Sequence, residues 1–467
     1  MIWQKILCKQ SIGYWVVLGL VLIASTVSIE AQLVPGPVPV PSPQHTTVFS
    51  LPQNVSNSPD ASSNHQIAVD SQGNINIIWL DKSPGYQAVF FSHSTDGGRS
   101  FSAPQNLSND PNGSFSVQMV VDPAGNIYVI WDDVNNNGFL TRSTDGGNSF
   151  SAPVNMAYGA LAVDSSGNIY LASQGPSANR FPAIYVSRSS DEGATFSTPV
   201  QASDGTSLPG TPSIALDSAG NVYLVWVNCP FGGCYLWFNH SNDGGASFGS
   251  QVALSSTEDA PSFSLTVGSA GSVYIASAIR SSGVALTWSV DGGTTFNRTG
   301  VASGAQQSFG KTQVAVDAVG NVNMVWDQGN AISYSVFFGR SVNGGATFSS
   351  INIGASRWPG QPQIALGTGG EINIVWVGPS PNYDVFFERS TDGGASFSAL
   401  QKLSNNTGND SPTPLIALDS CGNPKITWID NTAGNLDIFF SRGITAQSIL
   451  SGCAVLPASN SGIPLIH

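Results

Sequence analysis

A short run of acidic and asparagine residues has the composition of a metal-binding segment. Asp133, Asn135 and Asn137 place side-chain oxygens at alternate positions and are followed by Gly138, as in the first half of a calcium-binding loop. The glutamate that ends such a loop is absent, because Thr144 stands at that position. The segment predicts either a weak Ca²⁺ site or an Asn-rich turn without a ligand, and no other cofactor is expected.

A tryptophan beside an arginine offers a second kind of chemistry. Trp358 lies between Arg357 and Pro359 in a polar segment that precedes an apolar run. An indole ring can stack on a sugar ring, so Trp358 is a candidate ligand-binding residue, and a lid over neighbouring apolar side chains is the alternative. His65 is expected in the corresponding connecting segment near the start of the chain.

Of the five cysteines, four follow the first 31 residues: Cys229, Cys234, Cys421 and Cys453. An even number in an exported chain favours disulfides over metal binding or redox chemistry. Cys229 and Cys234 flank the turn-like sequence PFGG, which predicts a bridge across the mouth of a hairpin and leaves Cys421 to pair with Cys453. A zinc site is the alternative, but no histidine lies near these cysteines.

The N-terminus indicates export. Lys5 and Lys9 precede an apolar run at 14–24 and small or polar residues up to Ala31, which predicts a signal peptide over 1–31, with an uncleaved anchor as the alternative. A Pro-rich linker follows over 32–46. No later run is apolar enough to span a bilayer, so we expect a secreted, periplasmic or cell-surface protein without stable membrane insertion after signal cleavage.

The charge composition excludes one class of partner. The chain carries 29 acidic and 16 basic residues, giving a formal net charge of -13, and charged residues make up 10% of its 467 residues. A protein that follows nucleic-acid phosphates needs a positive surface, so nucleic acid is not expected as a partner. The 51 glycines suit an extracellular all-β protein with many turns.

The elements that must position any site are repeats. The signature Ser-x-Asp-x-Gly-x-x-Phe occurs seven times, at intervals of 46 to 52 residues. Such a box forms a tight turn between strands, because the carboxylate accepts backbone N–H bonds and the glycines adopt left-handed conformations. We therefore interpret the residue at its third position as structural. That residue is Asp96, Asp145, Asp191, Asp243, Asp291, Asn343 or Asp392.

A second signature, typically A-V/L-D-x-x-G-N followed by an apolar stretch and Trp, precedes each box. It predicts an apolar strand, a turn at the Gly-Asn pair and a second strand rich in β-branched and aromatic residues. With a third strand, the box and a fourth strand, each repeat matches one blade of a β-propeller. Its eight copies begin near Ile67, Met119, Leu161, Ile214, Leu265, Val314, Ile364 and Ile416.

The two ends of the repeat region predict how the ring closes. Eight sets of the first three strands are present, but the chain leaves the repeat after 436–442 without a fourth strand. The segment beginning at Val48, VFSLPQNVSNSP, closely matches the fourth strand of the first repeat, SFSAPQNLSNDP. We therefore predict an all-β fold, a single propeller over 47–445 with eight four-stranded blades, whose N-terminal strand completes the last blade. Seven or six blades are the alternatives, and 446–467 form a C-terminal tail.

The box and its spacing resemble the Asp-box, or bacterial neuraminidase repeat (BNR), proteins, of which sialidases are the best-known enzymes. The resemblance covers nearly all of 48–442 and is specific for the fold, but the box itself is shared by catalytic and non-catalytic propellers. It implies that a ligand binds on the face opposite the boxes, where the loops between second and third strands and between blades meet. The Arg-Ile-Pro motif of sialidases is absent; Arg180, Phe181 and Pro182 are a poor match in the third repeat.

The resemblance also implies which residues a sialidase-like site would need: three arginines that hold a carboxylate, a tyrosine activated by a glutamate, and an aspartic acid. The loops of that face supply weak candidates, and no motif pairs a tyrosine with a glutamate. The candidates are Arg180, Arg280, Arg357, Glu258, Asp259 and Tyr383.

Two functional hypotheses follow. The first is an exported, non-catalytic propeller, a monomer that binds a glycan or protein ligand, or acts as a scaffold, through the face opposite the boxes. The second is a sialidase-like glycoside hydrolase, which needs clustered carboxylates or a Tyr/Glu pair on that face. The absence of a recognisable catalytic motif favours the first hypothesis.

Overall fold

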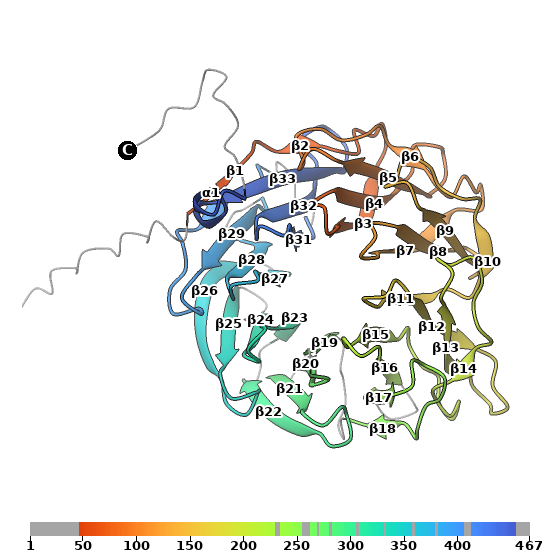
Figure 1. Cartoon of the computed structure of the whole chain (residues 1–467). Coiled ribbons are helices and arrows are strands. Elements are labelled where there is room, and N and C mark those ends of the chain that lie inside the picture. The colour runs from red at the N-terminus through yellow and green to blue at the C-terminus, as the bar shows by residue number, and fades with distance from the viewer. Residues whose placement is uncertain are drawn as a thin grey trace, which may run out of the picture. The chain divides into compact units, whose positions relative to one another are not determined.

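The computed structural model describes one compact unit. The chain divides into 1–40 and 41–467, and all described residues belong to the second unit. Within it the described residues form eight antiparallel sheets, arranged as blades around a common centre (Figure 1). The predicted eight-bladed propeller is therefore confirmed. The described residues are 46–228, 234–254, 262–268, 270–279, 283–304, 308–330, 333–356, 360–378, 382–405 and 412–453.

Each blade has four strands, named A to D from the centre outward, and blades 1 to 7 are continuous in sequence. Blade 1 is β3 (Ser62–Val69), β4 (Ile75–Asp81), β5 (Ala88–Ser94) and β6 (Gln105–Asn106). Blade 2 is β7 (Ser114–Val121), β8 (Ile127–Asp133), β9 (Gly138–Ser143) and β10 (Val154–Met156). Blade 3 is β11 (Gly159–Val163), β12 (Ile169–Gly175), β13 (Ala183–Ser189) and β14 (Val200–Gln201). Blade 4 is β15 (Ser213–Leu216), β16 (Val222–Asn228), β17 (Tyr235–Ser241) and β18 (Val252–Ala253).

The second half of the ring continues this pattern. Blade 5 is β19 (Ser262–Val267), β20 (Val273–Ile279), β21 (Gly283–Ser289) and β22 (Asn297–Ala302). Blade 6 is β23 (Ser308–Val316), β24 (Val322–Gly329), β25 (Tyr334–Ser341) and β26 (Ser349–Ser356). Blade 7 is β27 (Gln363–Leu366), β28 (Ile372–Val377), β29 (Val385–Ser390) and β30 (Gln401–Lys402). Blade 8 is β31 (Leu415–Leu418), β32 (Pro424–Asp430), β33 (Asp437–Thr445) and the N-terminal β1 (Thr47–Phe49) and β2 (Gln53–Asn54).

Blade 8 joins the two ends of the repeat region, as predicted. Val48 pairs with Ile444 in β33, and Gln53 pairs with Phe440 further along the same strand. Asp437 at the start of β33 is 2% exposed and holds the incoming segment. Its carboxylate accepts hydrogen bonds from the Asn54 amide at 2.9 Å, from the Ser56 hydroxyl and from the Ser58 N–H. The N-terminal strand therefore closes the ring and covers the edge of β33.

Strand B forms the core of each blade because its side chains are buried on both faces. A tryptophan near its end stacks on an aromatic residue of strand C in several blades, for example Trp79 on Phe90 with ring centroids 6.0 Å apart. The phenylalanine of each box packs between blades instead. Phe101 of blade 1 meets Phe440 of blade 8 edge to face, with centroids 4.9 Å apart. The strand-B tryptophans, all at most 1% exposed, are Trp79, Trp131, Trp226, Trp326, Trp376 and Trp428.

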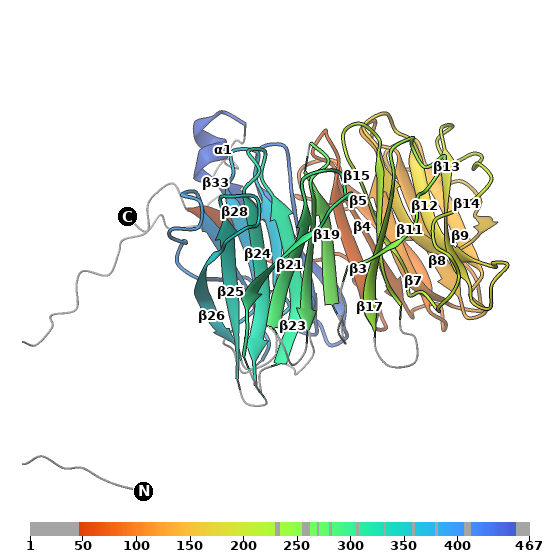
Figure 2. The same ribbon diagram turned by 90° about the horizontal axis from the view of Figure 1, so that it is seen from below.

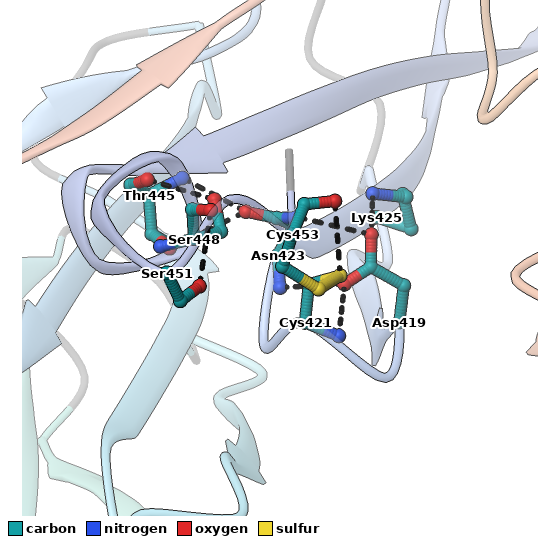
Figure 3. Close-up of a disulfide and its surroundings, with 8 residues drawn as sticks. All are labelled: Asp419, Cys421, Asn423, Lys425, Thr445, Ser448, Ser451 and Cys453. Carbon is teal, nitrogen blue, oxygen red and sulfur yellow. Dashed lines mark hydrogen bonds and ion pairs between the residues drawn. A yellow bond between two sulfur atoms is a disulfide. The ribbon is translucent and has the colours of Figure 1, made fainter. Parts of the chain in front are cut away.

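Blade 8 has no box, and a disulfide connects its A–B turn to the segment that follows its third strand. After β33 the chain forms the short helix α1 (Ala446–Leu450), which is capped by Thr445 and lies at one end of the ring (Figure 2). Cys453 then bonds to Cys421 in the A–B turn of the same blade, with the Cα atoms 5.8 Å apart (Figure 3). This confirms the predicted pairing and agrees with export to an oxidising compartment. Within the described ranges, no helix has the length and apolar character to cross a membrane.

Candidate functional site

Strand direction divides the loops between two faces. Because A, B, C and D are antiparallel neighbours, the A–B turns and the C–D turns with the boxes lie at one end of the blades. The B–C loops and the connections between blades lie at the other end. Figure 2 shows the strands running between these two ends. We call them the box face and the loop face.

The box carboxylates on the box face are fully engaged with their own turns. Asp145 accepts hydrogen bonds from the hydroxyl and N–H of Ser149 and from the hydroxyl of Ser143. These bonds lower the pKa of the Asp145 carboxyl to about 2. Asn343, the one amide among the boxes, accepts the same bonds from Ser341 and from the N–H of Thr347. These contacts support a structural role for the boxes.

On the loop face, strand A is interrupted by a β-bulge in three blades. In β3 the register shifts between Ser63 and Gln66, so that Asn64 and His65 together oppose one residue of β4. Equivalent shifts in β7 and β23 produce extra residues at Ser116 and Lys311. A bulge bends a strand and re-aims its side chains, and bulges are frequent beside binding sites. His65, expected in a connecting segment, therefore lies within a strand.

Two of these bulged residues interact electrostatically. His65 is 5% exposed, and its Nε2 has no hydrogen-bond partner among the described residues. Burial lowers the pKa of the His65 imidazole to about 4, a hydrogen bond with the backbone of Thr427 opposes this, and the positive charge of Lys311 lowers the pKa further. His65 is therefore neutral near pH 7. Blades 1 and 6 thus bring a neutral imidazole and an ammonium within electrostatic reach of each other.

A buried carboxylate accompanies Lys311. Asp327 in β24 is 0% exposed, and burial raises the pKa of its carboxyl to about 6, although nearby backbone N–H groups oppose the shift. These N–H groups belong to Gly310, Lys311 and the segment at 360–361, and the N–H of Gln361 donates to Oδ2 at 3.2 Å. Asp327 therefore links the segments that lead into blades 6 and 7. Its burial keeps it from touching a ligand directly.

A pocket of about 250 Å³ opens among the inner strands of blades 1 to 4. Gln66 and Gln118 form one wall, but their amides are already bonded to the next blade: Gln66 accepts from Met119 N–H and donates to Val117 C=O, and Gln118 accepts from Leu161 N–H. The other described lining residues are apolar or carry a hydroxyl group. It comprises Val117, Tyr158, Gly159, Ala160, Thr211, Pro212, Ser213 and Ile214.

Tyr158 is the titratable residue of this pocket. Burial raises the pKa of its phenol; a hydrogen bond with Ser116 opposes the shift, and the negative charge of Asp132 adds to it. Asp132 in turn accepts a hydrogen bond of 2.7 Å from the N–H of Ser116. A tyrosine and a carboxylate are therefore neighbours on the loop face. Their environment keeps the phenol protonated, which is the form that donates hydrogen bonds.

Four of the six sialidase-like candidates, Arg280, Arg357, Glu258 and Asp259, fall outside the described residues, and so does Trp358, the candidate for stacking on a sugar ring. Cys229 also lies outside them, so its predicted bridge with Cys234 stays a prediction.

Two of the predicted residues are described. Arg180 is exposed in the B–C loop of blade 3, and its guanidinium lies 5.4 Å from the ring centroid of Phe181. Tyr383 precedes β29 and has a left-handed backbone conformation, with a φ of 56°.

The calcium-like segment has the geometry of a repeat turn. Asp133 Oδ1 accepts the N–H groups of Asn135 and Asn137, each at 2.8 Å, and Asp133 Oδ2 accepts the Asn137 amide at 2.9 Å. Asp122 makes the same bonds in the A–B turn of blade 2. Among the described residues, no group of three or more His, Cys, Asp or Glu is arranged to hold a metal ion. Ca²⁺ binding at Asp133 stays a prediction.

Sequence reasoning missed Ser116, Tyr158 and Lys311. The bulges leave no distinct signal in one sequence, because the apolar alternation continues on both sides. Ser116 and Lys311 could have been found by aligning the eight repeats, since each stands three residues before the start of its A–B signature, at Met119 and Val314. Tyr158 stands in an unusually short connection between β10 and β11.

Comparison with known proteins finds distant structural likeness. No family model matches the chain, and no curated protein matches it. An ulvan lyase, a polysaccharide lyase, is 12% identical and has a TM-score of 0.49 over 88% of this chain and 100% of that one. A leech intramolecular trans-sialidase is 13% identical, with a TM-score of 0.40 over 89% and 94%. A protein of unknown function from Dyadobacter fermentans is 14% identical, with a TM-score of 0.41 over 65% and 97%. Likeness at this level carries no information on activity.

Proposed function

We propose that the protein is an exported, non-catalytic β-propeller that binds a glycan or protein ligand at the centre of its loop face. The observation that carries the proposal is the pocket among the inner strands of blades 1 to 4, with a volume of about 250 Å³. Concave sites lined by a few convergent polar groups are the usual location of ligands. The β-bulges in β3 and β7 border this pocket.

The described lining suits recognition by neutral hydrogen bonds. Thr211 and Ser213 offer hydroxyl groups, and the phenol of Tyr158 stays protonated. No carboxylate or cation belongs to the described residues that line this pocket. Such a lining can bind sugar hydroxyls or peptide groups, but it supplies neither an acid nor a base for bond cleavage.

The tyrosine and carboxylate pair is the one observation that favours a sialidase-like glycoside hydrolase. A tyrosine nucleophile needs a base that accepts its proton or a lowered pKa. The pKa of Tyr158 is raised instead, and burial is the main cause. Asp327, a carboxylate of the loop face whose pKa is raised by burial, is enclosed by backbone N–H groups. These features support binding over catalysis.

A blocking substitution tests the proposal. Thr211 is exposed and lines the pocket, so Thr211→Trp should fill it while leaving the blades intact. Thr198→Trp makes the same change at an exposed threonine that does not line the pocket and is the matched control. On an immobilised array of glycans and peptides, we expect T211W to lose at least one ligand that both wild type and T198W bind. A T211W binding profile identical to that of wild type would overturn the proposal.

The catalytic alternative is tested on the same proteins. A fluorogenic sialoside and unsubstituted oligosaccharides are incubated with wild type and with Tyr158→Phe. The proposal expects no release of fluorophore or reducing ends by either protein. If wild type cleaves one of these substrates and Y158F does not, hydrolysis would replace binding as the proposed function.

A further inference from the structure

A second and larger pocket lies at the outer edge of the ring. It has a volume of about 440 Å³ and lies between blades 3 and 4, where β14 and β18 are the outermost strands (Figure 1). We call it the rim groove. Its lining comes from β14 and the residues after it, from β17, and from the segment before β18. These residues are Gln201, Ala202, Ser203, Asp204, Trp237, Gly249, Ser250 and Gln251.

The repeats provide an internal control for this groove, because equivalent positions in other blades show what the fold alone requires. At the position of Trp237, which pairs with Trp226, blades 1 and 2 have Phe90 and Phe139. Phe90 and Phe139 stack on the strand-B tryptophans of their own blades. A phenylalanine therefore satisfies the fold, and the indole of Trp237 is an addition at the groove.

The segment before β18 contributes two further residues to the groove, Gly249 and Gln251. Gly249 stands where blades 1 to 3 have a serine, for example Ser102, whose hydroxyl accepts the His93 N–H. In blade 4 the side chain of Asn239 takes over this role: its Oδ1 accepts the His240 N–H, and its amide donates to Gly249 C=O at 2.8 Å. The missing side chain at 249 leaves the groove open.

Gln251 occupies a position that varies between blades: blades 1 to 3 have a proline there, and blades 5 to 7 have Thr299, Ile351 and Leu400. Its side-chain Oε1 accepts the N–H of Asp204 in the preceding blade at 3.1 Å, so it joins the two walls of the groove. The two departures from the repeat, Trp237 and Gly249, thus meet the bridging side chain of Gln251 at one cavity. Residues that the fold does not require indicate a binding function when they line the same cavity.

The polar groups of the groove define the ligand chemistry. The indole Nε1 of Trp237 and Nε2 of Gln251 have no hydrogen-bond partner among the described residues. Buried donors without partners are rare in proteins, because each carries a desolvation cost that a bonded acceptor removes. Exposed Asp204 and Ser250 add acceptors, and the lining residues that the structure describes include no cation. An aromatic ring beside amide, hydroxyl and carboxylate groups fits the apolar face and the hydroxyls of a sugar ring.

We propose that the rim groove is a binding subsite for a neutral oligosaccharide, separate from the pocket at the centre of the ring. Trp237 would pack against one sugar ring, and Gln201, Gln251 and Asp204 would bind its hydroxyl groups. A negatively charged sugar is disfavoured because, among the described lining residues, Asp204 carries a negative charge and no cation balances it. The proposal does not rest on the function assigned to the loop face.

Gly249 allows a test that does not disturb the fold. A Cβ atom added at Gly249 would meet no atom within 4 Å, so Gly249→Tyr should place a ring in the groove without a clash. Gly300 in β22 is also exposed and has equally open space, which makes Gly300→Tyr a matched control in blade 5. Trp237→Phe restores the residue of the other blades and removes the indole N–H. Equal unfolding midpoints for the three variants would show that each folds.

Binding is measured on the full chain by isothermal titration calorimetry with cellohexaose, xylohexaose, mannohexaose and chitohexaose, and with hexagalacturonate as the anionic comparison. We expect wild type and G300Y to bind at least one neutral hexaose. The affinity should fall at least about tenfold in G249Y and between about threefold and tenfold in W237F. T211W, which blocks the central pocket, should bind the hexaose like wild type.

Three results would overturn the proposal: no neutral hexaose binds wild type, hexagalacturonate alone binds, or G249Y binds as tightly as G300Y. If T211W loses hexaose binding and G249Y keeps it, the sugar binds in the central pocket. This result would refute the rim groove as a binding site and would support the function proposed for the loop face.

Discussion

Glu388 lies in β29, the third strand of blade 7, and 7% of its surface is exposed. At equivalent positions blades 1 and 2 have Ser92 and Thr141, whose hydroxyls donate to backbone C=O groups at 2.7 Å. Burial raises the pKa of the Glu388 carboxyl from 4.5 to about 8. The folded protein therefore keeps this proton at neutral pH, whereas the unfolded chain releases it.

The pH dependence follows from this difference. Between pH 4.5 and about 8 the folded state binds one proton more than the unfolded state at Glu388, so the free energy of unfolding decreases as pH rises. Each pKa unit corresponds to about 1.4 kcal/mol. At pH 7 the predicted loss relative to pH 4.5 is therefore about 3 kcal/mol, as an upper bound for a side chain that local rearrangement can hydrate.

Glu388→Gln isolates this contribution, because the amide has the shape of the protonated acid and does not titrate. Urea unfolding of wild type and E388Q, followed by tryptophan fluorescence from about pH 4.5 to about pH 8.5, measures the difference in unfolding free energy. We expect little difference at the acid end and a more stable E388Q by about 3 kcal/mol at neutral pH. Glu192→Gln, at an exposed position, is the control and should stay within about 0.5 kcal/mol throughout. A difference between wild type and E388Q that stays constant with pH would refute the reasoning.

Three further substitutions test the boxes, the disulfide and the closure of the ring. Asp96→Ala should lower the free energy of unfolding by about 1–2 kcal/mol, by analogy with helix caps, and leave ligand affinity unchanged; weaker binding with unchanged stability would contradict the face assignment. Replacing Cys421 and Cys453 by Ser should lower the free energy of unfolding, measured with denaturant, by about 3–4 kcal/mol, because the bridge closes a loop of 32 residues. Equal stability of reduced and oxidised wild type would contradict this prediction. Asp437→Ala removes the acceptor of three hydrogen bonds and should cost about 3 kcal/mol or more. Limited proteolysis should then release the N-terminal segment, and a resistant segment would show that other contacts close the ring.

The fold could be predicted because it repeats. The boxes and the A–B signatures recur with a nearly constant period, and each is a local turn whose residue types are required by backbone hydrogen bonding. The match between the segments at Val48 and Ser100 identified the closing strand, which pairs with β33. Cys421 and Cys453 are bonded as their number and position predicted.

The candidate site was predicted less well, because its residues come from different blades. The search of the loops for a sialidase-like set led to Arg180, which lies beside Phe181, while His65, Ser116 and Lys311 were not selected as site residues. A bulge depends on how one strand pairs with its neighbour, and one residue of register shift leaves the apolar pattern intact on either side.

The sequence by itself determined the blade, the number of blades, the closing strand and the turns, because these depend on interactions between residues that are close along the chain or repeated at a fixed period. Only the tertiary structure decided which polar residues share a cavity. Asp204 and Gln251 are 47 residues apart and meet because blades 3 and 4 pack side by side, and His65 interacts with Lys311 because the ring brings blades 1 and 6 together around its centre. Such neighbours are set by how the blades pack, and the turn residues that recur from blade to blade do not specify them.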